Sequence, residues 1–333
     1  MKKIFVLVAL TLIMGCGQNT TKDRSYLPES VGSINTLQVV APKEMWSGPV
    51  GDSIRQWFAA PTPGLPQIEP LFNISQIAPE HFTDFARSAR VILSLEYGDR
   101  DTVSLKTNAF ARPQLVAVAQ GTSEQSLIGL VRTQNSKWIA QMKAFELKER
   151  QRRTQISPKT PEGLAQAFGI ELQMPSAYRT AASSNEYYWL RKDLPSNGTT
   201  NILVYNAPLS IIPEEAEHPV SYIRHIRDAV GARLLPVEDD SRFITDTTYV
   251  PSATMERIEG RPTIISRGIW TLSDAFMGGP YLNMAIKDTT NNRYLIVEGF
   301  SYAPSMAKRD LQFELESILR TIKFVKGSDK NRD

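Results

Sequence analysis

Residues 281–302 read Tyr281-Leu-Asn-Met-Ala-Ile-Lys-Asp-Thr-Thr-Asn-Asn-Arg-Tyr-Leu-Ile-Val-Glu-Gly-Phe-Ser-Tyr302. Two segments rich in strand-forming residues, Tyr281–Lys287 and Arg293–Tyr302, flank the turn-forming run Asp288–Asn292, which predicts a β-hairpin. An amphipathic helix with Pro304 in its first turn is predicted next, because five apolar residues recur at helical spacing: Leu311, Leu315, Ile318, Leu319 and Ile322. A hairpin followed by a packing helix favours an α+β fold.

The residues before the hairpin extend this pattern. Strands are predicted at Ile170–Met174, Tyr187–Lys192 and Asn201–Tyr205, followed by a helix at Pro219–Val230 and strands near Thr263–Leu272. Strands grouped in runs, with helices between and after them, favour mainly antiparallel sheets with packed helices. By pattern, this second half resembles the Mog1/PsbP-like α/β/α sandwich.

The first half of the chain also consists of predicted strands with helices between and after them. The capping-box sequence Thr122-Ser-Glu-Gln125 introduces a long helix from Ser123 to about Arg150. The other predicted elements are helices at Asp52–Ala60 and Pro79–Ser88, and strands at Leu37–Ala41, Leu71–Ile77, Arg90–Tyr97 and within Val103–Val118. Both halves end in strands followed by an amphipathic helix, so two similar α/β halves, a diverged duplication, are one interpretation.

The run Pro158-Lys-Thr-Pro161 predicts a boundary between these halves. We therefore divide the folded part into α+β subdomains at 36–157 and 158–326, followed by a disordered tail at 327–333.

The amino terminus carries the most specific signal. Lys2 and Lys3 precede the apolar run Ile4–Met14, which is too short to span a membrane and fits a secretory signal. The next residues, Gly15 and Cys16, complete a sequence that resembles the bacterial lipobox, in which the cysteine is acylated, with chains such as palmitate, and the signal is cut before it. We predict a lipoprotein signal peptide at 1–15 and a flexible tether at 16–35; the alternative is an ordinary signal peptide with a chance cysteine.

An acylated Cys16 would hold the protein on a lipid bilayer, since two or more chains suffice for stable anchoring. We expect a location in the cell envelope, on the inner or the outer membrane. Lys22-Asp23 is a poor match to charged signals that carry lipoproteins to the cell surface, so we expect the protein to face the periplasm.

Composition excludes several classes of function. A single cysteine excludes an intramolecular disulfide and cysteine-rich metal clusters, and only three histidines argue against a histidine-built metal centre. The net charge of +3 falls to +1 once Lys2 and Lys3 leave with the signal, from 36 basic and 35 acidic residues, so nucleic acid is not an expected partner. We predict no cofactor and no metal.

No catalytic motif is present, and the polar clusters have simpler interpretations. Glu214–His218, with His225 and Asp228 on the following helix, could hold a divalent metal, but an acidic helix start is the favoured interpretation. The adjacent pair Asp239-Asp240 is assigned to a loop. The basic run of Lys148, Arg150, Arg152 and Arg153 is assigned to a solvated helix end, with an anionic-lipid or nucleic-acid patch as the alternative.

The run Tyr187-Tyr188-Trp189 lies on a predicted strand, where alternation places Tyr187 and Trp189 on one face and Tyr188 on the other. A platform that stacks on sugars or peptides is one interpretation of these aromatic residues, and packing in the core is the favoured one.

Four Asp-[Ser/Thr] pairs are followed by an aliphatic residue or threonine. This pattern resembles the O-glycosylation acceptor motif of Bacteroidota, although the same pairs are also common in turns and caps. The candidate acceptors are Ser53, Thr102, Thr247 and Thr289.

Three stretches resemble an uncharacterised Bacteroidota lipoprotein family, domain of unknown function family 4837, over nearly the whole mature chain. They are Ser47-Gly-Pro-Val-Gly-Asp52, Gly64-Leu-Pro-Gln-Ile-Glu-Pro-Leu-Phe72 and Val297-Glu-Gly-Phe-Ser-Tyr-Ala-Pro-Ser-Met-Ala-Lys-Arg-Asp310. The family supplies no activity and no catalytic residue. We expect a membrane-tethered, non-catalytic binding or assembly module whose partner is an envelope protein or glycan; the alternative is an envelope hydrolase with a dispersed active site.

Overall fold

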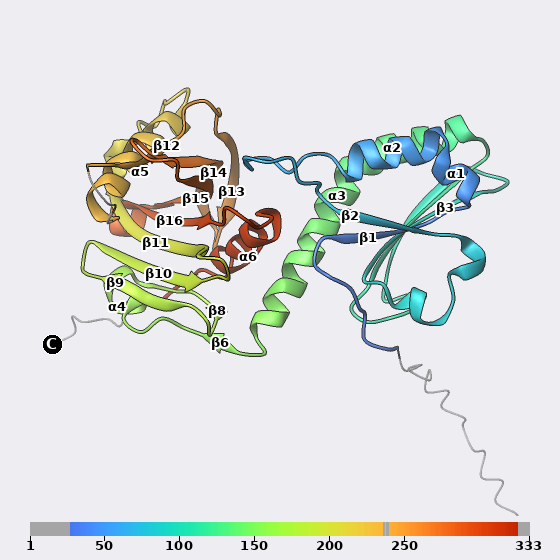
Figure 1. Ribbon diagram of the computed structural model, residues 1–333, viewed down its shortest axis with the longest axis horizontal. Helices are drawn as coiled ribbons and strands as arrows, with labels where there is room; N and C mark the ends of the chain where they lie inside the picture. The colour runs from blue at the N-terminus through green and yellow to red at the C-terminus, as the bar shows by residue number, and fades with distance from the viewer. Residues whose placement is uncertain (1–26, 236, 238–239, 326–333) are drawn as a thin grey trace, which may run out of the picture.

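The computed structural model describes residues 27–235, 237 and 240–325. Figure 1 shows two bodies, each built around one β-sheet, with the long helix α3 (Glu124–Thr154) between them. The predictions for the signal peptide, Cys16 and the tail at 327–333 lie outside the described residues, as does Asp239. The described end of the predicted tether belongs to the first domain, because Val31 N donates to Ser88 O at 2.8 Å and Asn35 is fully buried.

The first domain has a five-stranded sheet in the order β2-β1-β3-β5-β4. All its neighbouring strands run parallel except β4, which is antiparallel to β5. The strands are β1 (Thr36–Val40), β2 (Asn73–Ile77), β3 (Val91–Tyr97), β4 (Thr102–Thr107) and β5 (Leu115–Gly121). The apolar runs of β3 and β5 suit this arrangement, because strands in a parallel sheet are buried on both faces.

Helices cover one face of this sheet and short turns cover the other. Helices α1 (Lys43–Ser47), α2 (Pro49–Phe58) and α3 pack one apolar core against it. The 3₁₀ turns η1 (Pro79–His81) and η2 (Asp84–Ser88) lie in the segment that we predicted as one short helix, and Phe82 between them packs in a smaller core with Ile92.

Helix α3 begins where its first free amides find a side-chain acceptor. Ser123 is the N-cap, and its Oγ accepts from Ser126 N at 3.2 Å. Thr122, the first residue of the predicted capping box, lies one position too early and instead donates its hydroxyl to Asp101 at 2.9 Å. The helix extends four residues beyond the predicted end near Arg150, to Thr154.

The second domain has a larger and mainly antiparallel sheet, in the order β12-β14-β15-β16-β11-β10-β9, with β13 also paired to β14. Its strands are β9 (Arg179–Ser183), β10 (Tyr187–Asp193), β11 (Thr199–Pro208), β12 (Phe243–Thr245), β13 (Ser252–Ile258), β14 (Arg261–Leu272), β15 (Gly278–Asp288) and β16 (Arg293–Tyr302). The predicted hairpin is confirmed: β15 and β16 pair antiparallel from Tyr281↔Phe300 to Asp288↔Arg293.

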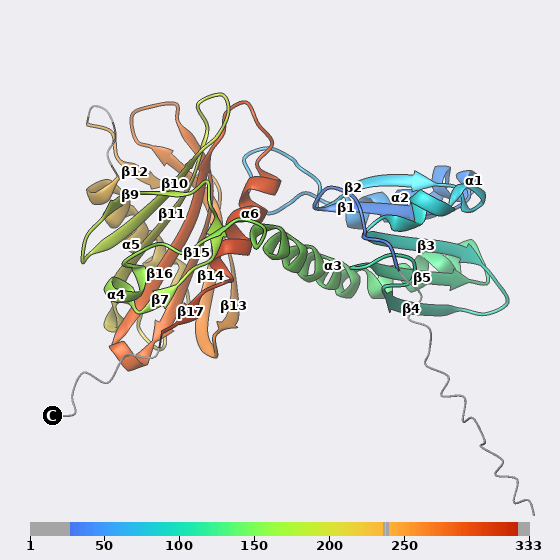
Figure 2. The ribbon, with the colours of Figure 1, turned by 90° about the horizontal axis from the view of Figure 1, so that it is seen from below.

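Helices lie on both faces of the second sheet (Figure 2). Helix α5 (Pro219–Leu234) packs over one face, in a core that includes Ile226 and Ile296. Helices α4 (Leu164–Phe168) and α6 (Arg309–Leu319) pack over the other, in a core that includes Phe168 and Leu315. Short pairs complete the domain: β6 (Pro158–Lys159) with β8 (Met174–Pro175), and β7 (Ile170–Glu171) with β17 (Lys323–Phe324).

The predicted α+β fold with packed helices is confirmed, and the predicted antiparallel pairing holds for the second sheet but not for the first, in which only β4 is antiparallel to its neighbour. The two sheets differ in strand order and direction, so the halves are not copies of one topology. Helix α6 begins at Arg309, so Pro304 precedes the helix instead of lying in its first turn. In addition, β12 and β13 had no counterpart among the predicted elements. Most side chains of β13 are exposed, so its sequence lacks the alternation of apolar and polar residues that would predict a strand.

The two domains meet at the start of α6. The carboxylate of Glu69, on a loop of the first domain, accepts from the backbone amides of Lys308 at 2.7 Å and Arg309 at 2.9 Å. Asn35 donates to Asp310 at 2.9 Å across the same contact. Because the first amides of a helix have no partner inside it, Glu69 supplies to α6 an acceptor that the second domain lacks at this point.

Helix α3 makes the second contact between the domains. Arg150 pairs with Glu314 on α6, and Gln151 Nε2 donates to Ser317 O at 3.0 Å. Arg152 and Arg153 both bind Glu149. The predicted solvated helix end describes Lys148 and Arg152, which are exposed, and Arg153, which is half-buried. Arg150 differs, because α3 continues along the second domain and brings it to Glu314.

Candidate functional site

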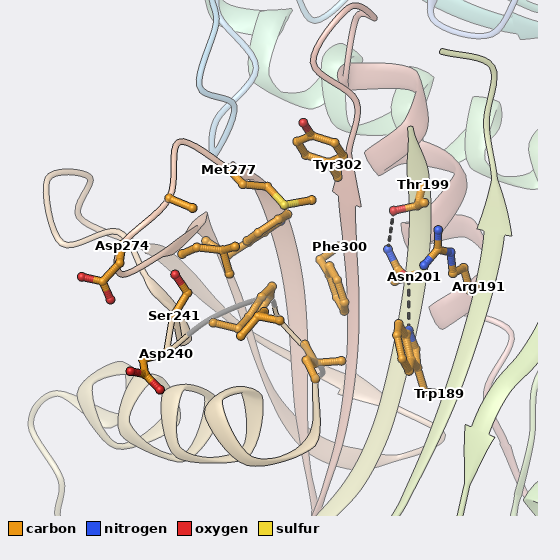
Figure 3. A pocket seen from close by; sticks show the side chains of 16 residues that line it. Trp189, Arg191, Thr199, Asn201, Asp240, Ser241, Asp274, Met277, Phe300 and Tyr302 are labelled. Atoms are coloured by element: carbon orange, nitrogen blue, oxygen red, sulfur yellow. Dashed lines mark hydrogen bonds between the residues drawn. The ribbon is translucent and has the colours of Figure 1, made fainter. Parts of the chain in front are cut away.

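A cavity lies in the second domain, on the face of the sheet that carries α5 (Figure 3). Its volume is about 630 Å³, and Leu235 and Val237, which follow the carboxyl end of α5, contribute to its lining. Five strands and two connecting segments supply its walls: Trp189, Arg191, Thr199, Asn201, Leu235, Val237, Asp240, Ser241, Phe243, Trp270, Leu272, Asp274, Ala275, Met277, Phe300 and Tyr302.

Aromatic rings form the floor of the cavity. Phe243 stacks on Trp270 with 4.7 Å between ring centres, and it contacts Phe300 at 5.0 Å. Tyr302 lies 6.4 Å from Trp270. Strand alternation explains the arrangement, because Phe300 and Tyr302 are two residues apart on β16 and therefore share a face. Trp270 Nε1 donates to Ser301 O at 3.1 Å, which fixes the orientation of the indole.

A polar ladder on β10 and β11 forms one rim. Trp189 Nε1 donates to Asn201 Oδ1 at 3.1 Å, and Asn201 Nδ2 donates to Thr199 Oγ1 at 3.0 Å. Arg191 lies next to them in Figure 3, and its Nε donates to Asp193 at 2.8 Å. The amide of Asn201 is thus held at both ends by its neighbours, so this rim is rigid before any ligand arrives.

The opposite rim is acidic. It carries Asp240, Ser241 and Asp274, which Figure 3 shows across the aromatic floor from Arg191 and Asn201. Asp240 and Asp274 are exposed, whereas Ser241 is buried. The two segments of this rim are tied together, since Arg242 N donates to Ser273 Oγ at 3.0 Å.

A buried charge cluster lies next to the floor, on the same face of the sheet. Arg227 on α5 donates through Nε to Glu298 on β16 at 2.9 Å and through Nη1 to Thr245 on β12 at 2.9 Å. Its guanidinium lies 4.8 Å from the centre of the Phe243 ring and 4.0 Å from that of Tyr281. Burial raises the pKa of Glu298, which the Arg227 cation opposes, and burial raises the pKa of Tyr281 to about 12.

The aromatic run on β10 divides as alternation predicted. Tyr187 and Trp189 lie on the α5 face, and Tyr188 packs in the core on the opposite face. Packing in the core, the favoured interpretation, describes all three residues, and Trp189 in addition lines the cavity.

The other sequence candidates do not come together at this cavity. Thr102, Thr247 and Thr289 are exposed, on β4, in the turn after β12 and in η4 (Thr289–Asn291), while Ser53 is half-buried in α2. Their glycosylation stays a prediction. Asp228, from the acidic and histidine cluster, accepts from Thr245 N at 2.7 Å. Within 27–235, 237 and 240–325, no three His, Cys, Asp or Glu side chains form a metal-ligand group.

Sequence reasoning missed most of the floor. Phe243, Trp270 and Phe300 lie on three strands and are up to 57 residues apart, so no local motif contains them. Only the pairing of β12 with β14, and of β14, β15 and β16 in series, brings the rings together. Period-2 alternation along β16 was the one available signal, because it places Phe300 on the same face as Tyr302.

Comparison with protein families assigns both domains. Residues 157–321 match the family described as Domain of unknown function (DUF4837). The match to DUF4837 covers the second domain and does not extend into the first. Residues 30–155 match a separate family, Domain of unknown function (DUF8532). The cavity therefore lies within the DUF4837 domain, and curated protein sequences contain no match to the chain.

Solved structures show limited likeness to the chain. A Mog1 mutant protein is 11% identical with a TM-score of 0.33, and the match covers 52% of this chain and 98% of that protein. The Ran-binding protein Mog1p of Saccharomyces cerevisiae is 11% identical with a TM-score of 0.32, covering 51% and 96%. A protein from Bacteroides thetaiotaomicron is 12% identical with a TM-score of 0.21, covering 50% and 48%.

Among the described residues, 27–325 with gaps at 236 and 238–239, no helix is both long enough and apolar enough to span a bilayer.

Proposed function

We propose that the protein is a membrane-tethered, non-catalytic binding module of the cell envelope, and that its DUF4837 domain holds an apolar ligand in the aromatic cavity. The observation that carries the proposal is the floor built by Phe243, Trp270, Phe300 and Tyr302 inside a cavity of about 630 Å³. Ligand sites are typically concave, mostly apolar and roughly 300–1,000 Å³ in volume, with a few polar groups that orient the ligand.

The walls favour an apolar ligand over a strongly hydrated one. Leu235, Val237, Leu272 and Met277 line the cavity along with the rings. The amide of Asn201 already uses one acceptor site for Trp189 and one N–H for Thr199, so half of its hydrogen-bonding capacity is left for a sugar hydroxyl. Desolvating this surface would contribute about 25 cal/mol for each Å² of apolar area covered.

The site is also held in shape before binding. Arg227 links α5 to β16 and β12, and Asp228 binds the backbone of β12 at Thr245, so the strand that carries Phe243 is tied down from two sides. A preformed pocket requires less ordering when the ligand arrives, which favours affinity.

The tether rests on the sequence of residues 1–16. Lys2, Lys3, the apolar run and Gly15-Cys16 support lipid attachment and export, and the expected face is the periplasmic one. In that arrangement the binding domain would act close to a membrane surface, where its ligand would be met.

The cavity is tested with Nile red, a neutral apolar dye whose fluorescence rises on burial. Ala275→Trp places a large side chain at an exposed lining position, so it should fill the cavity without disturbing the core, whereas Phe276→Ser removes an adjacent ring that is fully exposed. We expect the first change to weaken dye binding by about tenfold or more, the loss of roughly 1.4 kcal/mol. The second change should have little effect. Equal binding by both variants and the unchanged protein would contradict the proposal.

A further inference from the structure

The two rims of the cavity carry opposite charge. On the β10 side, Arg191 and Arg179 share the single carboxylate of Asp193, at 2.8 Å and 3.2 Å. These hydrogen bonds lower the pKa of Asp193, so it is ionised and the three groups together carry one net positive charge. On the other side, the lining residues Asp240 and Asp274 carry two negative charges.

The apolar floor lies between these charges. Figure 3 shows Met277 and Phe300 between the rim of Arg191 and Asn201 and the rim of Asp240 and Asp274. A ligand that crosses the floor therefore has a guanidinium near one end and carboxylates near the other. Complementary charge fixes the orientation of a ligand and excludes ligands whose charges are reversed or of one sign.

We infer that the ligand is a short peptide with free ends and an apolar or aromatic side chain. Its carboxylate would face Arg191, its ammonium group would face Asp240 and Asp274, and its side chain would rest on Phe300 and Met277. This inference rests on the proposed function, since it assigns the ligand of the same cavity.

Other apolar ligands fit the charges less well. A fatty acid offers an anion to Arg191 but places an uncharged tail beside the two carboxylates. A neutral sugar uses neither rim charge, and its hydroxyls would meet Leu272 and Phe243 on the floor. A guanidinium is suited to a carboxylate, because its planar array of N–H donors matches the two oxygens.

The volume also fits a small number of residues. A cavity of about 630 Å³ is within the range that holds small organic ligands, and it is too small for a folded partner. The half-exposed positions of Met277 and Tyr302 at the opening leave a path by which a peptide can enter.

The probe is an equimolar mixture of tripeptides Ala-X-Ala, with Phe, Leu, Met or Trp at the centre. The mixture is prepared with free ends, with an acetylated amino end, and with an amidated carboxyl end. Binding to the full chain is measured by isothermal titration calorimetry and by competition with Nile red, and the peptides are recovered afterwards for mass spectrometry.

We expect the free peptides to bind about tenfold more tightly than either blocked form, a difference of roughly 1.4 kcal/mol, because each blocked form loses one charge-assisted contact. Arg191→Gln should remove the preference for a free carboxyl end, and Asp274→Asn should reduce the preference for a free amino end. Arg233→Gln is the matched control, because Arg233 also forms an exposed ion pair in this domain, with Glu186, but belongs to neither rim and does not line the cavity.

The outcomes separate this inference from the proposed function. Equal binding of free and blocked peptides would overturn the inference, as would tighter competition by dodecanoate than by the free peptides. If Ala275→Trp still weakens Nile red binding in that case, the proposed function stands. If Ala275→Trp has no effect on Nile red binding, both the peptide inference and the proposed function are overturned. Recovery of cleaved peptides would overturn the non-catalytic assignment.

Discussion

Arg227 and Glu298 form an ion pair of 2.9 Å in the interior of the second domain, with each side chain almost completely buried. The pair joins α5 to β16 next to the aromatic floor, on the same face of the sheet. Asn283 donates to the second oxygen of Glu298 at 2.9 Å, so the carboxylate has partners on both sides. A buried ion pair of this kind specifies how the helix packs, because it holds α5 over one position of the sheet.

Removing one partner of this pair should be strongly destabilising. Arg227→Met leaves a buried carboxylate without its cation, and we expect the free energy of unfolding to fall by about 3–5 kcal/mol. Urea denaturation followed by circular dichroism measures the change. The double variant Arg227→Met with Glu298→Leu should recover much of the loss, because it leaves no unpaired charge. A double variant that is less stable than the single one would contradict this account.

Glu69 should stabilise α6 from the other domain. Glu69→Gln replaces one acceptor oxygen with an N–H donor that faces the backbone amides of Lys308 and Arg309. We expect a loss of about 1 kcal/mol, as for other helix caps, and faster hydrogen exchange at the start of α6. Glu80→Gln, at an exposed position of η1, is the control. Exchange at α6 that is unchanged by both substitutions would show that the contact has no stabilising role.

Lys143 should make stability depend on pH. Its Nζ donates to Asn35 Oδ1 at 2.8 Å and lies 4.3 Å from the centre of the Phe72 ring. Burial, the larger cause, and the nearby Arg309 cation lower its pKa from 10.5 to about 7, against the opposing effect of Asp310, Glu146 and Glu316.

Between about pH 7 and 10.5 the unfolded chain therefore holds the Lys143 proton that the folded chain has lost. The free energy of unfolding should rise with pH across this window, by at most about 1.4 kcal/mol per pH unit for one proton. Below about pH 7 the contribution of Lys143 should not change with pH. Lys143→Met should remove that rise, and Lys148→Met, exposed on the same helix, should keep it. Parallel curves for the unchanged protein and Lys143→Met would contradict the assignment.

Cys16→Ser tests the tether. If Cys16 is acylated, an alkyne-tagged palmitate supplied to cells should label the unchanged protein and fail to label the variant, which should leave the membrane fraction. Gly17→Ala is a neighbouring control that keeps the cysteine. Equal labelling and equal membrane association of Cys16→Ser would contradict the lipid anchor.

Local pattern predicted more of the fold than of the site, for identifiable reasons. The β15–β16 hairpin and α3 were predictable, because turn residues at 288–292 and helical spacing from Leu127 to Phe145 are contiguous signals. The parallel first sheet was not, since strand direction depends on crossovers between distant segments. Trp189 was noted from its strand, but its partners Phe243, Trp270 and Phe300 become neighbours only through pairing across the sheet.

The cap at Glu69 was hidden for the same reason. It lies 239 residues from Lys308, and nothing in the sequence near α6 shows that a carboxylate from the first domain will satisfy the helix. Its own neighbours, Pro66 and Pro70, indicated only an irregular loop.

The central claim, that the aromatic cavity is the ligand site, is tested most directly by the indole N–H signals of the protein labelled with ¹⁵N-tryptophan. Trp189 and Trp270 line the cavity, whereas the other three tryptophans, Trp46, Trp57 and Trp138, belong to the first domain and act as internal controls. We predict that the free tripeptide mixture, or Nile red, shifts the signals of Trp189 and Trp270 and leaves the other three in place. Shifts confined to the first domain, or of equal size at all five positions, would contradict the account.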